Sequence, residues 1–500
     1  MMIMFWVFDI AILFELLLLC TPLGWHLRKF LAPLALLLTA FASGGIALWR
    51  PSIFSVLFLV IGLYRVFNMV RIVENRMHTL YLRHATRRTG LLLMALQILL
   101  VTLWAAWEYW HTSNVHMYWA VFAGMQTWVA FIFLASTLRR LRRTAWSSTL
   151  AAMSDSELPT VSVAIPARNE TEDLEECLRS IIASDYPKLE VLVLDDCSQT
   201  KRTSDIIRNF AHDGVRFIQG EEPGDTWLPK NQAYDRLAKE ASGEYILFCG
   251  VDVRFDAVSI RELLTLMASK KKEMVSILPW RSESAGVALT QSMRYWWELV
   301  PPRRLFQRPP VLSTCWIISR HILEQSGGFA AVARSITPEA FFARHAASHD
   351  AYSFMRASVT SGIVSVKATR EQRETAVRTR YPQLHRRPEN VCIVSLAELL
   401  FLVMPFGLAI AGFWFSVGWV AQTLAMIAVV LLTLTYELLT RTTRTGGALF
   451  GLIGLPVGIL YDICLLHYSM WQYEFSTVDW KGRNICIPAM HVTPHLPRLE

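Results

Sequence analysis

The sequence predicts an α/β domain with a mostly parallel sheet, embedded in a polytopic α-helical membrane protein. The 500 residues are 53% hydrophobic and have a mean hydropathy of +0.32, which is too apolar for a soluble chain of this size. Apolar stretches long enough to span a bilayer flank a polar segment at 155–388. Within that segment, short apolar runs alternate with amphipathic helical patterns, which is typical of a parallel sheet covered on both faces.

The N-terminal region, residues 1–140, is predicted to contribute about five membrane helices. Its apolar stretches lie at about 3–23, 31–49, 52–68, 90–108 and 117–137. The first lacks the basic start and the cleavage site of a signal peptide, so we interpret it as a span. Basic residues cluster at 65–88 and 139–143, whereas the connection around 108–116 has no Lys or Arg. By the positive-inside rule, the polar segment then lies in the cytoplasm.

The C-terminal membrane region, residues 391–471, is predicted to hold two or three helices, followed by a tail at 472–500. Gly454-Leu455-Pro456 lies inside the last apolar stretch, where it could break a helix or form a re-entrant turn. The number of C-terminal spans, and with it the side of the membrane on which the tail lies, therefore stays open.

The net charge indicates which kind of partner the protein binds, and the spacing of the cysteines indicates whether they bind a metal. The net charge of +8 comes largely from basic residues beside apolar runs. We therefore expect contact with anionic lipid, and no nucleic-acid partner. The eight cysteines show no metal-ligand spacing, and we expect them to be reduced and structural.

The polar segment shows four strand patterns and four helix patterns in alternation. The strands are expected at 161–165, 191–194, 215–218 and 245–248. The helices are expected at 172–183, 204–211, 231–241 and 258–269. The first helix shows the pattern most clearly, because Leu174, Cys177, Leu178 and Ile181 fall on one face.

Two polar motifs follow the first two predicted strands. Pro166 is expected to end the first strand, and Arg168, Asn169 and Glu170 follow it. Asp195-Asp196-Cys197-Ser198 ends the second strand. Open α/β sheets place their ligands at the carboxyl ends of their strands, so these side chains could bond a nucleobase or a ribose. The alternatives are a helix cap by Asn169 or Thr171, and a plain strand-to-helix turn at the two aspartates.

In this order and spacing, the two motifs resemble family 2 glycosyltransferases of the GT-A fold. Three further stretches extend the resemblance, Trp227–Asn231, Gly243–Phe248 and Gly327-Gly328-Phe329. The resemblance covers about residues 160–385. It implies a Rossmann-like GT-A domain that binds a nucleotide sugar, with a UDP-sugar favoured and a GDP-sugar possible. It also implies which residues bind the donor: Pro166, Arg168, Asn169, Glu170, Asp195, Asp196 and Lys230.

The same resemblance implies a divalent metal, Mg²⁺ or Mn²⁺, held at an Asp-x-Asp motif. Here the motif reads Gly250-Val251-Asp252, so its first acid is missing. Asp252 is therefore the expected side-chain ligand of its motif, with phosphate oxygens and water supplying the others.

The resemblance also implies a catalytic base shortly after the glycine turn at Gly327-Gly328, since inverting transfer needs a carboxylate that accepts the acceptor's proton. Glu339 follows Thr337 and Pro338 at a predicted helix start, where negative charge is stabilised. Thr337 could cap that helix. Asp350 is the second choice, although it lies where a turn and a strand are expected. A Glu at a helix start with no chemical role is the alternative for Glu339.

Downstream, Arg380 and Tyr381 occupy the place of the Arg-Trp of a Gln-x-x-Arg-Trp motif. The resemblance implies that Arg380 lies near the departing phosphate and Tyr381 near the acceptor. Val377 stands at the Gln position, which weakens the case for a processive polymer synthase. The stretch is more similar to the hopanoid-biosynthesis-associated, lipid-acting branch, as is the tail motif Trp480-Lys481-Gly482-Arg483. A basic amphipathic helix on the membrane surface is the alternative interpretation.

Together these observations predict an inverting glycosyltransferase in the bacterial inner membrane. Its cytoplasmic domain would transfer a sugar from a nucleotide diphosphate sugar to a membrane lipid or lipid-linked acceptor. Two alternatives stay open. One is a processive polysaccharide synthase, and the other is a catalytically silent membrane protein that binds a nucleotide sugar or acts as a scaffold.

Overall fold

The computed structural model divides the chain into two compact units. The first comprises Met1–Leu134 and Leu400–Leu432, and the second comprises Ala135–Leu399 and Thr433–Glu500. The structure describes residues 7–8, 10–12, 14, 25–49, 53–74, 92–100, 115–146, 153–224, 226–281, 295–302, 309–367, 369–415, 417–441 and 450–485.

Some sequence-based predictions lie partly outside these residues. Most of the span predicted at 3–23, most of the basic stretch at 65–88, about half of the span at 90–108 and the tail beyond residue 485 are not described.

Apolar helices form the first unit. They include α2 (Trp25–Trp49), α3 (Ile53–Glu74), much of α5 (Val115–Arg143), α15 (Met404–Ala411) and part of α16 (Trp419–Arg441). Helices α2 and α3 pack against each other. Thr127 Oγ1 of α5 donates to the Leu424 carbonyl of α16 over 2.8 Å. Helices α2, α3 and α5 coincide with the apolar stretches predicted at 31–49, 52–68 and 117–137.

Four helices in the described part of the chain are long and apolar enough to cross a membrane. They are His116–Arg143, Pro388–Ala411, Trp419–Thr440 and Ile453–Phe475. Their length and composition are compatible with the predicted membrane embedding.

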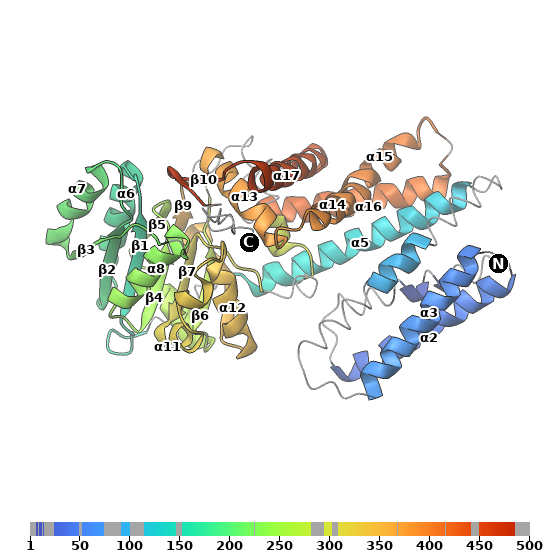
Figure 1. The fold of residues 1–500 in the computed structure, drawn as a ribbon, viewed down its shortest axis with the longest axis horizontal. Coiled ribbons are helices and arrows are strands. Elements are labelled where there is room, and N and C mark those ends of the chain that lie inside the picture. Colours follow the sequence, from blue (N-terminus) through green and yellow to red (C-terminus); the bar gives the residue numbers. More distant parts are fainter. Residues whose placement is uncertain are drawn as a thin grey trace, which may run out of the picture. The chain divides into compact units, whose positions relative to one another are not determined.

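A seven-stranded sheet forms the centre of the second unit (Figure 1). Its strands are β1 (Val161–Ala167), β2 (Leu189–Asp195), β3 (Val215–Gln219), β4 (Tyr245–Cys249), β6 (Met274–Leu278), β7 (Cys315–Ser319) and β8 (Tyr352–Arg356). Their order is β3-β2-β1-β4-β7-β6-β8, and within this sheet only β7 runs antiparallel to its neighbours. The predicted, mostly parallel sheet is confirmed.

Helices cover both faces of this sheet. On one face, α6 (Glu172–Ile182), α7 (Arg202–Asn209) and α9 (Ser259–Ser269) bury one set of alternating strand residues. On the other, α8 (Pro229–Glu240), α11 (Arg320–Gln325) and α12 (Pro338–Ser348) bury the opposite set. The four strands and four helices expected between 161 and 269 all form, with ends within about two residues of the prediction.

The predicted end of the first strand is wrong. Strand β1 continues through Pro166 to Ala167, where it pairs with Asp195 of β2. On its other side β1 pairs with β4 only as far as Ala164. Pro166 therefore lies beyond the ladder with β4, where a residue that lacks an N–H can remain in a strand.

The described part of the second unit also contains three C-terminal helices and a short hairpin. Helices α13 (Thr369–Gln383) and α14 (Pro388–Glu398) pack on α17 (Phe450–Phe475). Helix α17 runs without interruption through Pro456, so the break considered at Gly454-Leu455-Pro456 does not occur. Strands β10 (Asp479–Trp480) and β11 (Arg483–Asn484) then pair antiparallel.

Candidate active site

The two polar motifs predicted from the sequence meet at the carboxyl ends of β1 and β2. The Asp196 amide donates to the Ala167 carbonyl over 2.8 Å. The Asn169 amide donates to Ser198 Oγ over 2.9 Å, and Asn169 Oδ1 accepts from the Gln199 amide over 2.8 Å. Asn169 therefore joins the two turns and does not cap α6. Thr171 precedes α6, but its side chain makes no cap hydrogen bond.

Asp195 and Asp196 are adjacent, but their carboxylates have different surroundings. Asp195 Oδ1 accepts from the amide and the hydroxyl of Ser198 over 3.0 and 2.5 Å, which fixes the turn. Asp196 is 3% exposed, and its Oδ1 accepts from Arg483 over 2.8 Å. Its Oδ2 is buried and has no hydrogen-bond partner among the described residues. Such an atom carries an uncompensated desolvation cost, which a ligand's N–H group would offset.

Arg168 and Glu170 also contact the C-terminal tail. The Arg168 guanidinium donates to the carbonyls of Asp196 and Cys197, both over 2.6 Å, and to the Lys481 carbonyl over 3.1 Å. Glu170 forms an ion pair with Lys481. Burial raises the pKa of the Glu170 carboxyl above its usual value, and the Lys481 ammonium opposes that shift. Burial likewise raises the pKa of Asp196, and Arg483 opposes it.

Three residues at the ends of β1 and β2 and in the hairpin that contacts them have left-handed backbone conformations. Asn169 and Cys197 both have φ of 51°, and Lys481 has φ of 46°. Asn adopts this conformation readily, but Cys and Lys do so less often. Uncommon backbone conformations concentrate at functional sites, where the surrounding structure holds them in place.

Asp252 follows β4 and lies between Gly250 and strand β9 (Ile363–Ser365), which pairs with β5 (Val253–Phe255). Its Oδ2 accepts from Ser365 Oγ over 3.0 Å. Its Oδ1 lies so close to the Gly250 Cα that any Cβ there would fall far inside van der Waals contact. Glycine at the expected acid position therefore leaves room for the Asp252 carboxylate.

The residues around Asp252 fit a metal ion only if the protein supplies few of its ligands. Among the described residues no group of three His, Cys, Asp or Glu side chains could hold an ion. Mg²⁺ and similar ions can be held by one carboxylate when substrate phosphates and water complete the coordination shell. Among the described residues, Asp252 fits such a site with one carboxylate, and not a site built from three or more His, Cys, Asp or Glu side chains.

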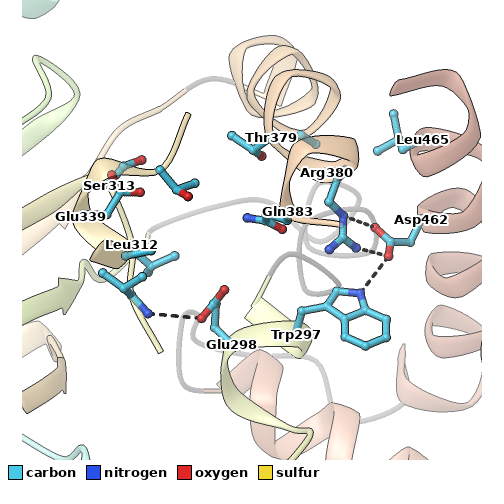
Figure 2. A pocket seen from close by; sticks show the side chains of 14 residues that line it. Trp297, Glu298, Leu312, Ser313, Glu339, Thr379, Arg380, Gln383, Asp462 and Leu465 are labelled. Carbon is cyan, nitrogen blue, oxygen red and sulfur yellow. Dashed lines mark hydrogen bonds and ion pairs between the residues drawn. The ribbon is translucent and has the colours of Figure 1, made fainter. Parts of the chain in front are cut away.

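A pocket of about 60 Å³ lies beside the start of α12 (Figure 2). By volume, it could hold about four water-sized groups. It is lined by Trp297, Glu298, Val311, Leu312, Ser313, Thr337, Glu339, Ala340, Ala376, Thr379, Arg380, Gln383, Asp462 and Leu465. The lining brings together the start of α12, one face of α13 and the middle of α17.

The structure separates the two candidate bases. Glu339 lines the pocket and is 3% exposed, next to Pro338 at the start of α12. Thr337 precedes the helix, but its side chain makes no cap bond, so the expected cap is wrong. Asp350 follows the other end of α12, its side chain is 99% exposed, and its Oδ1 lies 3.0 Å from Lys272 Nζ. Only Glu339 is both buried and in the pocket.

Arg380 and Tyr381 have different environments. The Arg380 guanidinium forms a two-point ion pair with Asp462 of α17, and Trp297 Nε1 donates to Asp462 Oδ2 over 3.0 Å. Tyr381 is fully buried, and its hydroxyl donates to Glu474 Oε1 over 2.6 Å. Tyr381 does not line the pocket and serves to pack α13 on α17.

Lys230 lies in the first turn of α8, as the resemblance led us to expect for a residue near a nucleotide sugar. Its ammonium is 5.0 Å from the centroid of the Tyr234 ring.

Two groups at these sites were not among the residues predicted from the sequence. Asp462 is an acid in the middle of an apolar helix, which by itself signals a functional or paired residue. Lys481 and Arg483 belong to a motif that was noticed, but nothing in the sequence located it beside Glu170 and Asp196.

Comparison with known proteins identifies the domain. Residues 162–327 match the model of Glycosyl transferase family 2. The chain is similar to the glycosyltransferase AglE of Haloferax volcanii, with 35% identity over 101 residues, which cover 19% of this chain and 32% of that protein. It is also similar to the probable glycosyltransferase YdaM of Bacillus subtilis, with 26% identity over 184 residues, 35% of this chain and 43% of that protein.

Among solved structures, the chain is similar to the mannosyltransferase PcManGT from Pyrobaculum calidifontis, with 18% identity and a TM-score of 0.43. The match covers 71% of this chain and all of that one. The chain spans less than half the length of the curated relatives it matches. The match to the family model shows that the chain carries a glycosyltransferase family 2 domain over residues 162–327.

Proposed function

We propose that this protein is an inverting glycosyltransferase of the bacterial inner membrane. It would transfer a sugar from a nucleotide diphosphate sugar to a membrane lipid or lipid-linked acceptor on the cytoplasmic face. The observation that carries this proposal is the position of Glu339. It is a buried carboxylate at a helix start, in a pocket of the second unit that is also lined by the apolar helix α17.

The donor would bind at the ends of β1 and β2. The Oδ2 of Asp196, which has no hydrogen-bond partner among the described residues, suits a ring N–H of uracil or guanine, so UDP- and GDP-sugars are both candidates. Lys230 is positioned at the start of α8, where a cation and the helix N-terminus both favour phosphate. Mg²⁺ or Mn²⁺ held by Asp252 would neutralise charge on the diphosphate.

The chemical step would use Glu339 as the base. Its carboxylate would accept the proton of the acceptor hydroxyl while the oxygen attacks the anomeric carbon. The nucleoside diphosphate would leave from the opposite face of the sugar, which gives inversion. The start of α12 stabilises the ionised form of Glu339 before the transfer.

The proposal of a lipid acceptor rests on the apolar helix at the pocket and on exposed aromatic residues in the first unit. Arg380 already balances Asp462, so we assign it the role of holding α13 against α17 at the pocket and not of meeting the leaving group. In the first unit, Phe413, Trp414, Phe415 and Trp419 are exposed around one helix connection. Aromatic residues gather in this way at membrane interfaces, which supports membrane embedding and access of a lipid acceptor.

The proposal is tested with the full-length protein in detergent or nanodiscs. Wild type is incubated with a panel of labelled UDP- and GDP-sugars and a bacterial lipid extract, with and without Mn²⁺. We expect one labelled lipid product, and at least a 100-fold slower transfer by Glu339→Gln. Asp350→Asn, which removes an exposed carboxylate near the other end of α12, serves as the matched control and should retain activity.

Three results would count against this proposal. Full activity of Glu339→Gln would remove the assigned base. Binding of UDP or GDP by wild type without transfer to any lipid would favour the catalytically silent alternative, and a ladder of long products would favour a processive synthase.

A further inference from the structure

We propose that the C-terminal hairpin, residues 478–485, forms a wall of the donor's nucleoside subsite. In this assignment Arg483 is the positioning residue for Asp196, and Lys481 is that for Glu170. The inference rests on the proposed function, because it assumes that the ends of β1 and β2 bind the nucleoside of a donor.

The hairpin contacts both motifs at this corner. Arg483 NH1 donates to Asp196 Oδ1 over 2.8 Å, and its NH2 donates to Glu222 Oε2 over 2.7 Å. Lys481 pairs with Glu170, and its carbonyl accepts from Arg168 Nε over 3.1 Å. A segment 311 residues after Glu170 and 287 residues after Asp196 thus supplies the cations for these two acids, which follow β1 and β2.

The hairpin is held in place by a backbone hydrogen bond and by the packing of its side chains. The Ile485 amide donates to the Val478 carbonyl over 2.9 Å, and both side chains are buried in a cluster with Leu228 and Tyr381. The Arg378 guanidinium lies 5.5 Å from the centroid of the Trp480 ring. These contacts fix the hairpin to α13 and α17, so Arg483 is held in place at little further entropic cost.

The pairing at Asp196 leaves a defined acceptor for a ligand. Arg483 takes Oδ1, while Oδ2 remains buried with no hydrogen-bond partner in the part of the chain that the structure describes. Arg483 therefore orients the carboxylate, so that Oδ2 can accept from a ring N–H of a base. Without that cation the carboxylate would lose its fixed orientation.

Charge gives a second reason for the assignment. Glu170, Asp196 and Glu222 form an acidic corner that would repel the diphosphate of an incoming donor. Lys481 and Arg483 pair with all three carboxylates and remove most of that repulsion. The tail therefore makes an acidic corner compatible with an anionic ligand.

The test measures binding of UDP and GDP to the full-length protein by calorimetry, together with donor KM and kcat. We expect Arg483→Gln to weaken binding of the preferred nucleotide about tenfold and to raise donor KM similarly, with kcat within about twofold. Arg483→Lys should recover part of the loss. Arg236→Gln is the matched control, because it also removes an Arg–Glu pair, but an exposed one on α8, and it should leave binding unchanged.

A double-mutant cycle makes the test specific. Because Arg483 acts through Asp196, Arg483→Gln combined with Asp196→Asn should bind nucleotide about as well as the weaker single variant. If Arg483→Gln does not fold, Lys481→Gln tests the same wall through Glu170, and we expect about threefold weaker binding.

The outcomes separate this inference from the proposed function. If wild type binds UDP or GDP and Arg483→Gln binds equally well, the hairpin is not part of the site. Tighter binding by Arg483→Gln would identify the hairpin as a plug that the donor displaces, which also overturns the assignment. If wild type binds neither nucleotide, the proposed function fails together with this inference.

Discussion

The acidic corner of Glu170, Asp196 and Glu222 and the pocket beside α12 each contain a buried ion pair between distant parts of the chain. The two pairs differ in how many oxygens of the carboxylate are engaged. At the acidic corner, Arg483 engages one oxygen of Asp196, and the other oxygen is buried with no hydrogen-bond partner among the described residues. In the pocket, Arg380 and Trp297 together engage both oxygens of Asp462. We therefore propose that the first pair presents an acid to a ligand, whereas the second joins helices.

This comparison shows that a buried ion pair does not by itself indicate a binding site. What distinguishes the two is the capacity that remains for hydrogen bonding once internal partners are counted. Asp196 has an acceptor left over, so we assign it to the donor. Asp462 has both oxygens engaged, so we assign it to the packing of α17 on α13.

The largest effect is expected on stability, when the ion pair between Arg380 and Asp462 in the pocket is broken. Arg380→Met leaves Asp462 buried without its cation and should cost about 3–5 kcal/mol of stability. Arg380→Met with Asp462→Leu removes both charges and should recover most of that loss, because apolar replacement of a whole buried pair is often nearly neutral. Thermal unfolding in detergent measures both variants. A double variant no more stable than the single one would contradict a purely packing role.

A somewhat smaller effect, on activity, is expected at the metal motif. Asp252→Asn should slow metal-dependent transfer about 100-fold, equivalent to about 2.7 kcal/mol, because it removes the one carboxylate ligand expected there. Asp205→Asn, an exposed acid on α7, is the control. Gly250→Asp restores the acid that the motif lacks, yet it should also reduce activity, since its Cβ displaces the Asp252 carboxylate. A gain of activity in Gly250→Asp would show that the glycine does not serve Asp252.

The same comparison explains what could be predicted from the sequence. Strands and helices between 161 and 269 followed from hydrophobic periodicity, which local residues determine. Asp196 could be placed at a strand end and Glu339 at a helix start because turn and helix-start chemistry is also local, whereas Asp252 was singled out by the family resemblance. The pairs Arg380–Asp462 and Asp196–Arg483 join residues 82 and 287 positions apart, and no local rule selects such partners. Pro166 was misplaced because the ladder that tolerates it is likewise a non-local property.

The position of the hairpin also bears on the open count of C-terminal spans. Arg483 and Lys481 contact the family 2 domain, and residues in contact lie on one side of a membrane. If that domain is cytoplasmic, we propose that the tail is cytoplasmic too. Three complete C-terminal crossings would place it outside, so one of the apolar helices would have to lie in the interface.

A moderate effect should separate the two adjacent aspartates. Asp196→Asn should weaken binding of UDP or GDP about tenfold, with little change in stability. Asp195→Asn should do the reverse, costing about 1 kcal/mol of stability through weaker bonds to Ser198, with a smaller effect on affinity. Calorimetry for binding and thermal unfolding for stability test both. If Asp195→Asn weakens nucleotide binding more than Asp196→Asn does, the two assignments must be exchanged.

The smallest effect concerns pH. Burial raises the pKa of the Asp196 carboxyl, so its acceptor function is present above that raised value and is lost as the pH falls through it. Binding of UDP should therefore weaken on acidification at a higher pH than an exposed aspartate would dictate. The ratio of wild-type to Asp196→Asn affinity cancels the titration of the diphosphate itself. Glu170, whose pKa burial also raises, titrates in both proteins and cancels as well. We expect this ratio to shrink towards one as the pH is lowered, because a protonated Asp196 no longer offers an ionised acceptor to the base. A ratio that stays constant with pH would mean that the ionised carboxylate of Asp196 makes no contact with the nucleotide.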